Sequence, residues 1–439
     1  MIFFFYLLNG FLLGGVIYAF WRRQKAISIK NWFFPALFLK LLSGLLIGFF
    51  YQQYFAGGDT FLFQSQSGLL TQYLKESPGA YFGLWFTDTF ESETVRKAMV
   101  FHTYSNSYFL VLLLSMLNLL TQNQYFLNAL YFSLFSFMGA WQLTKTLAFI
   151  YPENKYAAMV AFLFFPSVVF WSAGITKEAI YIGALAWLMS AILNLVFANY
   201  TLQLKEVVSA VVASYLLWEI KFYFAAVVFP LLFSYAVLTW ARRKYPAAPV
   251  FRYQFFLLAG GILLLSLVVA QMHHVFELKF FFYQLTENYN QLLALSQQKP
   301  HISYPNLEPT VTSVVLHAPL AVLQATLRPF FWEGDTWFYR IAGLENLIIL
   351  LLLVGCIVYF LLHPPRHLDV FVLILLIYIF IVAALIGLTT PNLGSLSRYK
   401  TAFLPFLVYL LLQKNIVPKL FEPRSLPKRP TARIWERKA

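Results

Sequence analysis

Long apolar runs, separated by short polar turns, occupy most of this chain. The first run begins at Ile2 and ends near Phe20. A helix needs about 20 apolar residues to cross a bilayer, and its backbone groups must be paired within the segment. The pattern predicts an all-α polytopic membrane protein with about eleven transmembrane helices and a few juxtamembrane helices. The predicted crossings are 2–20, 32–55, 125–146, 156–173, 178–198, 206–220, 222–240, 253–271, 341–362, 368–388 and 399–413.

Composition supports a membrane protein and excludes several other classes. Of 439 residues, 60% are hydrophobic and only 11% are charged, whereas soluble domains carry about 25% charged residues. The net charge of +14 collects in short segments between apolar runs, as the positive-inside rule predicts, so we expect no nucleic-acid partner. The single cysteine, Cys356, excludes an intrachain disulfide.

Basic segments predict which ends of the helices face the cytoplasm. They lie at 22–30, 242–252 and 364–366, and in the tail from residue 414. The N-terminus is then outside and the C-terminus inside. This threading predicts a single transmembrane domain over 1–415, with extracytoplasmic loops at 56–106 and 273–340 and a basic cytoplasmic tail at 416–439.

Between residues 106 and 242 the chain must cross an odd number of times, yet six apolar segments occur there. The shortest, Tyr108 to Leu120, is the natural choice for a juxtamembrane or re-entrant helix. With that choice Lys177, Glu178 and Lys221 fall on the outer side, which they share with the first external loop.

The first external loop opens with Gly57-Gly58-Asp59. Glycine permits a tight turn, which would hold the carboxylate close to the membrane surface. A carboxylate partly removed from water can act as a general base. Alternatively, Asp59 caps the helix that follows it.

Charged residues also stand at a turn between two apolar helices, where Lys177 and Glu178 follow Gly174. Ionisable groups at membrane depth are costly and therefore indicate function by default. The alternative is an interfacial pair, with the lysine extended toward the surface and the glutamate complementing a helix dipole.

Three further cations reach the predicted outer side. Lys221, with Glu219, interrupts an apolar stretch and should separate two helices, while Arg328 and Arg398 lie at the outer ends of later segments. Arginine holds phosphate in a bidentate fork. Each residue alone is typical of an interfacial anchor, but together they surround one loop carboxylate with positive charge.

Asp88 and His102 are additional candidate site residues in the first external loop. Asp88 stands in a mixed-charge stretch that is typical of a solvated helix face. We find no motif for metal, phosphate-loop or serine-hydrolase chemistry. We therefore expect no cofactor and no metal site, and nothing in the sequence indicates a divalent cation.

Three segments resemble bacterial membrane glycosyltransferases of the GT-C fold, which are related to protein mannosyltransferases and the lipid A aminoarabinose transferase. Gly58-Asp59-Thr60-Phe61-Leu62-Phe63 is similar to the acidic element of their first external loop. Phe165 to Lys177 and Arg398-Tyr399-Lys400 are similar to two later elements. The chain differs from that family in placing two helices before the acidic loop, and Thr60 where many members have a second acidic residue.

The resemblance implies a location in the bacterial cytoplasmic membrane and a site that faces the periplasm or exterior. A polyprenyl-phosphate-linked sugar would be the donor, and a glycan, lipid or protein the acceptor. Asp59 would act as the general base with inversion, while Arg398, Lys177, Arg328 and Lys221 would hold the lipid phosphate. This hypothesis requires Asp59 to lie close to those cations.

Three alternatives remain open. A lipid-linked polysaccharide polymerase or ligase would rely on residues of the second external loop, such as His301, His317 and Arg328. A transporter or flippase would line a path with charges from both faces and use broken helices at mid-membrane. A non-enzymatic subunit of an envelope complex is the third.

Overall fold

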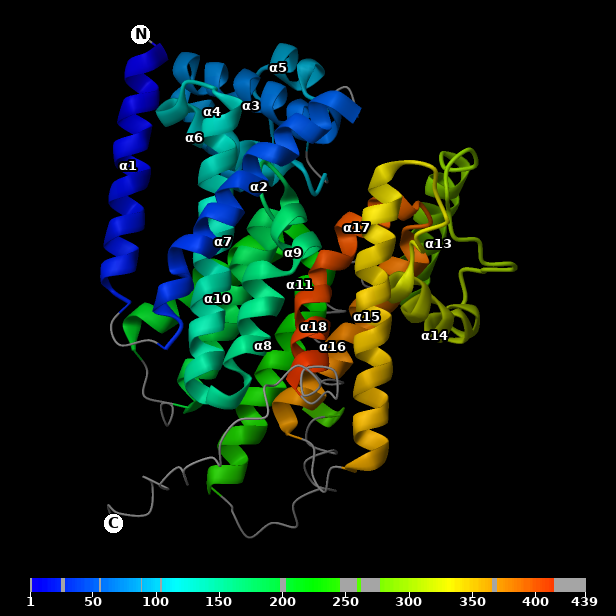
Figure 1. Cartoon of the computed structure of the whole chain (residues 1–439). Coiled ribbons are helices and arrows are strands. Elements are labelled where there is room, and N and C mark those ends of the chain that lie inside the picture. The colour runs from blue at the N-terminus through cyan, green and yellow to red at the C-terminus, as the bar shows by residue number, and fades with distance from the viewer. Residues whose placement is uncertain are drawn as a thin grey trace.

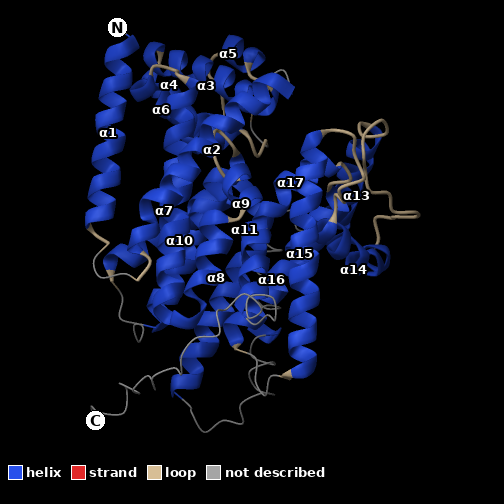
Figure 2. Ribbon diagram, in the orientation of Figure 1, coloured by secondary structure: helices blue, strands red, loops and turns tan. Residues whose placement is uncertain are grey.

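The computed structural model of the chain is a bundle of helices (Figure 1). Its described residues form no strand beyond one isolated bridge between His301 and Asn392 (Figure 2). The all-α prediction is therefore confirmed for this part of the chain. The structure describes residues 2–24, 28–54, 57–87, 89–102, 105–197, 203–244, 259–261, 277–364 and 369–413.

The first half of the chain supplies two long helices, a group of shorter ones and then a second long pair. In Figure 1, α1 runs along one edge of the bundle, and α3, α4 and α5 gather at the end where α1 begins. The elements are α1 (Ile2–Arg22), α2 (Phe33–Tyr54), α3 (Gly58–Glu76), α4 (Pro78–Thr87), α5 (Glu93–Ala98), α6 (Tyr108–Thr121), α7 (Tyr125–Ile150), α8 (Lys155–Met159), α9 (Pro166–Trp171) and α10 (Lys177–Phe197).

The second half contributes the other edge of the bundle. α15 stands there in Figure 1, with α13 and α14 on its outer side. Short 3-10 turns occur at Lys30–Trp32, Pro152–Asn154 and Lys400–Ala402, and a π-helical turn at Val160–Phe164. The remaining elements are α11 (Leu204–Lys244), α13 (Leu278–Ala294), α14 (Val311–Leu327), α15 (Trp337–Leu362), α16 (Val370–Thr389), α17 (Leu393–Tyr399) and α18 (Leu404–Gln413).

Several helices are long and apolar enough to cross a membrane. The described residues contain six of them, or seven if the bent pair α6 and α7 forms one span. The chain is therefore a multi-pass membrane protein. The six are Phe4–Arg22, Lys30–Tyr54, Lys177–Phe197, Leu204–Arg242, Trp337–Leu362 and Val370–Thr389.

The predicted crossing at 156–173 is not one continuous helix. The chain passes from α8 through the π-helical turn, becomes extended at Phe165 (φ −67°, ψ 121°) and restarts at Pro166 as α9. Proline lacks the N–H that a continuing helix needs, and it disfavours helical geometry in the residue before it. A break therefore replaces the expected straight span.

Two other predicted crossings are joined, and one is shortened. α11 includes both 206–220 and 222–240, but Lys221 interrupts it with non-helical angles (φ −150°, ψ 69°), so the break predicted at this lysine is present. The segment 399–413 consists of a 3-10 turn and the ten-residue α18. Most of 253–271, and the tail 416–439, lie outside the described residues.

Two features concern segments predicted to lie at the membrane surface. α6 is bent by 117° from α7, which agrees with a short helix that does not continue the span. Within the predicted outer loop 273–340, α14 packs directly against α16: a Cβ on Gly387 would lie 2.5 Å from the carbonyl oxygen of Ala321. That part of the loop is thus a packed apolar helix beside a candidate span.

Candidate functional site

The turn before α3 sets the position of Asp59. Gly57 and Gly58 both have positive φ (92° and 50°), a conformation that glycine adopts readily. α3 begins at Gly58, and no side chain caps it. Asp59 thus lies inside the first turn and is not the helix cap. The ring of Phe61 stacks on Tyr125 at 4.1 Å and fixes this turn against α7.

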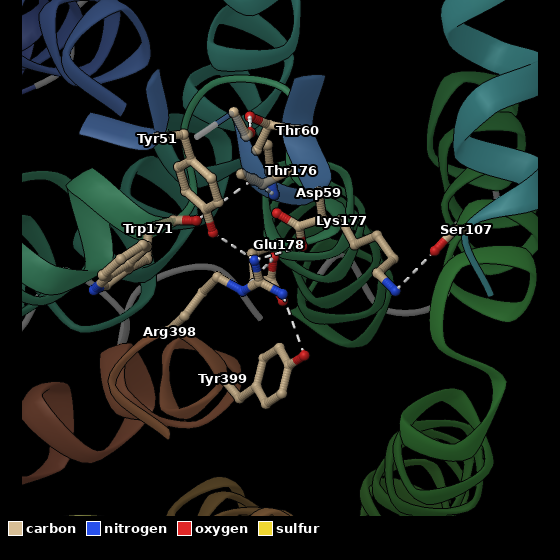
Figure 3. A network of polar contacts seen from close by, with 12 residues as sticks. Tyr51, Asp59, Thr60, Ser107, Trp171, Thr176, Lys177, Glu178, Arg398 and Tyr399 are labelled. Atoms are coloured by element: carbon tan, nitrogen blue, oxygen red, sulfur yellow. Dashed lines mark hydrogen bonds and ion pairs between the residues drawn. The ribbon is translucent and has the colours of Figure 1, made fainter. Parts of the chain in front are cut away.

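Arg398, on α17, reaches the carboxylate of Asp59. Its Nη1 donates to Asp59 Oδ2 at 2.7 Å and to the Tyr51 hydroxyl at 2.6 Å. Its Nη2 donates to the Tyr399 hydroxyl at 3.2 Å (Figure 3). The geometric requirement of the sequence hypothesis, a carboxylate close to a cation 339 residues away, is met for this pair.

A second carboxylate, that of Glu178, lies close to Arg398. Thr176 accepts the N–H of Ala179, which starts α10 so that Glu178 falls in its first turn. Glu178 Oε1 accepts from Lys221 Nζ at 2.9 Å, and Oε2 lies 3.8 Å from Arg398 Nε. The side chains of Glu178 and Lys221 are only 2% and 3% exposed, so this is a buried ion pair and not an interfacial one.

The kink in α11 lies at Lys221, the cation of this ion pair. Lys221 sits at the non-helical residue and lies over three aromatic rings, at 5.1 Å from Tyr399, 5.3 Å from Phe224 and 5.7 Å from Tyr181. Such cation–π contacts stabilise a desolvated ammonium group. The break in the helix thus coincides with a lysine held between a carboxylate and aromatic faces.

Lys177 occupies the other side of the site. Its Nζ donates to Ser107 Oγ at 3.2 Å, which ties α10 to the residue preceding α6. Its charge interacts with those of Glu178, Lys221 and Arg398. In Figure 3 it extends away from Trp171, on the opposite side of Arg398.

Five residues therefore form one charged cluster, which carries three cations against two carboxylates: Asp59, Lys177, Glu178, Lys221 and Arg398. Its net formal charge is positive. Burial is the largest influence on the pKa of Arg398 and lowers it, but Glu178 and the other anionic or phenolic neighbours outweigh burial and raise the pKa well above its ordinary value. Arg398 is thus a permanent cation.

Two atoms of the charged cluster lack hydrogen-bond partners within the described ranges. Asp59 Oδ1 and Arg398 Nε are both buried atoms without one. Asp59 is nevertheless the most accessible of the ion-paired members, because its side chain is 33% exposed against 12% for Arg398. The cluster can therefore accept one further donor at Asp59 and one further acceptor at Arg398.

Arg328 takes part in a different ion pair, with Glu333. Its Nη2 lies 2.5 Å from Glu333 Oε1, and its other contacts are the side chain of Gln324 and the carbonyl of His301. These contacts, with Glu333, Gln324 and His301, do not include a member of the charged cluster, and the role of Arg328 in holding a lipid phosphate stays a prediction.

Two further candidates, His102 and Asp88, come from the first external loop and stay predictions. His102 is exposed in the loop between α5 and α6, whereas the charged cluster is largely buried. Asp88 lies outside the described residues. No three His, Cys, Asp or Glu side chains come close enough to hold a metal ion in the ranges that the structure describes.

Sequence reasoning missed two tyrosines, Tyr51 and Tyr399, whose hydroxyls accept from Arg398. Tyr399 could have been found because it is adjacent to Arg398. Tyr51 gives no such signal, because a tyrosine near the end of an apolar helix is typical of any membrane interface.

Buried polar groups deeper in the bundle were also missed. Lys40 donates to Ser172 Oγ at 2.5 Å. Lys400 donates to Asn346, whose neighbour Glu345 accepts the backbone N–H of Ser167 at 2.9 Å. These contacts hold the two ends of α9, the short helix that follows the break at Phe165.

Comparison of the chain with models of protein families, with curated proteins and with solved structures finds no match. The geometry of the charged cluster is therefore the basis for any functional assignment.

Proposed function

We propose that this protein is a membrane glycosyltransferase that moves a sugar from a polyprenyl-phosphate donor to a hydroxyl acceptor. The observation that carries the proposal is the charged cluster, in which three largely enclosed cations, with Lys221 3% and Arg398 12% exposed, outnumber two carboxylates beside an unpaired carboxylate oxygen. An excess of buried positive charge favours an anionic ligand, and arginine is well suited to phosphate.

The reaction would be a single displacement. The acceptor oxygen forms a bond to the anomeric carbon while the bond from that carbon to the donor phosphate oxygen breaks, which inverts the configuration. Asp59 Oδ1 receives the proton of the acceptor hydroxyl. The departing lipid phosphate keeps the electron pair, and Arg398, with Lys177 and Lys221, stabilises its negative charge.

Glu178 has a different role in this proposal. It is paired with both Lys221 and Arg398, so it orients these cations and does not accept a proton. Its negative charge also offsets the repulsion between them when no phosphate is bound.

The proposed orientation follows from the basic segments of the sequence. The N-terminus and α3 to α5 would face the periplasm or exterior, and the C-terminus the cytoplasm of a bacterium, with about eleven crossings and a GT-C-like arrangement. Figure 1 supports the shared side of the N-terminus and the first loop, because α1 begins at the end where α3, α4 and α5 gather.

The direct test is transfer from a radiolabelled polyprenyl-phosphate sugar by the purified protein in membranes that supply acceptors. Asp59→Asn should abolish transfer while undecaprenyl phosphate still binds and the unfolding temperature is unchanged. Retained transfer in this variant would refute the base assignment. A preformed lipid-linked glycan as donor separates a polymerase or ligase from a single-sugar transferase.

A transporter is the second candidate, because the structure contains features that the sequence did not reveal. α8 and α9 form a broken helix, and Lys40, Glu345 and Lys400 are buried near it. Discontinuous helices with buried charges are typical of transport sites. Movement of a fluorescent lipid phosphate from one leaflet of a proteoliposome membrane to the other, with no sugar transferred, would favour a transporter.

A further inference from the structure

Aromatic side chains adjoin the charged cluster on the side opposite Lys177. Tyr51 belongs to both groups, since its hydroxyl accepts from Arg398 and its ring packs with Trp171 and Ile47 in a cluster separate from the main core. Figure 3 shows Trp171 on the far side of Tyr51 from Lys177. We name this group the aromatic strip; its members are Phe50, Tyr51, Tyr54, Phe170, Trp171, Trp337 and Phe338.

Phe50 is the centre of the aromatic strip. Its ring centroid lies 5.2 Å from that of Tyr54, 5.8 Å from Phe338, 6.0 Å from Trp171 and 6.1 Å from Trp337. These rings come from α2, α9 and α15. Aromatic side chains therefore join α2 to α15 beside the site.

Exposure increases along the strip with distance from Arg398. Tyr51 and Trp171 are 6% and 4% exposed, whereas Trp337 and Tyr54 are 48% and 60% exposed. Trp337 Nε1 donates to the Tyr54 hydroxyl at 3.1 Å at the outer end. An interfacial belt explains exposed tryptophan and tyrosine at helix ends, but it does not explain buried rings that continue inward to an arginine.

We infer that the aromatic strip binds the isoprenoid chain of the lipid phosphate whose head group Arg398 holds. The inference rests on the proposed function and adds the path of the lipid. An isoprenoid is apolar, with flat alkene units and methyl branches that pack on ring faces. Because Tyr51 contacts both Arg398 and the strip, the first isoprene unit would meet these rings directly.

A second apolar surface within the described residues is a competing site for the isoprenoid chain. A hollow of about 460 Å³ lies between α10 and α11 and is lined by residues such as Leu188, Phe229 and Trp240. Leu188 is ten residues beyond Glu178 on α10, which corresponds to about 15 Å along the helix. A lipid whose phosphate is at Arg398 therefore reaches the strip before the hollow.

Photo-cross-linking distinguishes the two surfaces. The full chain in phosphatidylcholine nanodiscs is irradiated with undecaprenyl phosphate that carries a diazirine in the isoprene unit next to the phosphate. We expect labelling of the peptides that contain Phe50 to Tyr54 and Trp337 to Phe338. Labelling confined to the peptides around Leu188 and Phe229 would overturn the inference.

Affinity measurements on variants provide an independent test. Trp337→Leu removes an exposed ring with little risk to folding and should weaken undecaprenyl phosphate binding about fivefold. Trp337→Tyr keeps an aromatic ring at this position and should retain most of the wild-type affinity. Phe149→Leu is the control: this aromatic position on α7 is even more exposed than Trp337 (81% against 48%), and the variant should bind as the wild type does. Equal affinities for Trp337→Leu and Phe149→Leu would contradict the inference.

Arg398→Gln separates the inference from the proposed function. If Arg398→Gln greatly reduces labelling, the assignment of Arg398 to the lipid phosphate stands. The peptides labelled in the wild-type protein then show whether the isoprenoid chain lies on the aromatic strip or in the hollow between α10 and α11. Labelling that is unchanged in Arg398→Gln would refute the phosphate site and, with it, the proposed function.

Discussion

Two polar groups in this bundle both include residues of α3 and differ in how completely they are paired. The first is an amide network between α3, α6 and α7, in which Asn128 donates to Asn118 at 2.7 Å and to Gln64 at 3.0 Å. Asn118 in turn donates to Ser67 at 2.9 Å. The second is the charged cluster, which leaves a carboxylate oxygen and a guanidinium nitrogen without hydrogen bonds among the described residues.

The difference indicates separate tasks. A neutral buried network whose members bond to one another rigidifies the fold, and this one fixes α3, the helix that begins beside Asp59. A buried set of charges is costly unless it is fully paired. An incompletely paired set beside an accessible carboxylate is therefore expected to complete its contacts with a ligand.

The largest expected effect comes from Glu178→Gln. It leaves Lys221 buried without its carboxylate and Arg398 with Asp59 alone, and loss of one partner of a buried ion pair costs about 3–5 kcal/mol. We expect a marked fall in unfolding temperature in detergent. Glu93→Gln, at the exposed pair with Lys97, is the control and should change little. An equal, small shift in both variants would contradict the view that Glu178 balances buried charge.

Asn128→Ala should have the next largest effect. It removes two donors from the amide network and leaves buried acceptors unpaired, which costs about 1–3 kcal/mol. Stability should fall, yet undecaprenyl phosphate should bind with nearly unchanged affinity once the protein is folded. Lost binding in a folded Asn128→Ala protein would show that the two groups are not separate.

Arg398→Lys tests the charged cluster with its charge retained. Lysine cannot reproduce a two-pronged contact with phosphate, so binding of undecaprenyl phosphate should weaken about tenfold. Titration in nanodiscs gives the affinity, and the unfolding temperature serves as the check on folding. Wild-type affinity would indicate that only the charge at this position matters.

Lys177→Gln should give the smallest effect. Lys177 contacts Ser107 and no carboxylate at hydrogen-bond distance that the structure records, so we expect about threefold weaker lipid phosphate binding and a weaker dependence on salt. Affinity at low and high ionic strength measures both. A salt dependence identical to that of the wild type would show that Lys177 does not belong to the phosphate site.

The sequence predicted the helical class and brought together the principal residues of the site. Asp59 and Arg398 were linked because both stand at the same predicted membrane surface, and Lys221 was expected at a break between helices. These predictions rest on charge within apolar sequence, where each polar residue is informative. The pairing of Arg328 with Glu333 was missed, although the two residues are only five positions apart.

Other features could not be predicted for physical reasons. Pro166 indicates a possible break in a helix, but only the folded bundle provides Glu345 to accept the N–H of Ser167 and so stabilise the restart of α9. The role of Tyr51 depends on an arginine from the other end of the chain. Such contacts depend on tertiary packing and leave no local pattern.

The short turn from Arg398 to Lys400 has a consequence for the rest of the bundle. Arg398 is held by Asp59, while Lys400, two residues later, is held by Asn346 of α15. A ligand that shifts the backbone at Arg398 would therefore also disturb the contact from Lys400 to Asn346. Occupancy of the charged cluster is thereby linked through one short turn to the interior of α15, the helix whose first turn supplies Trp337 and Phe338 to the aromatic strip.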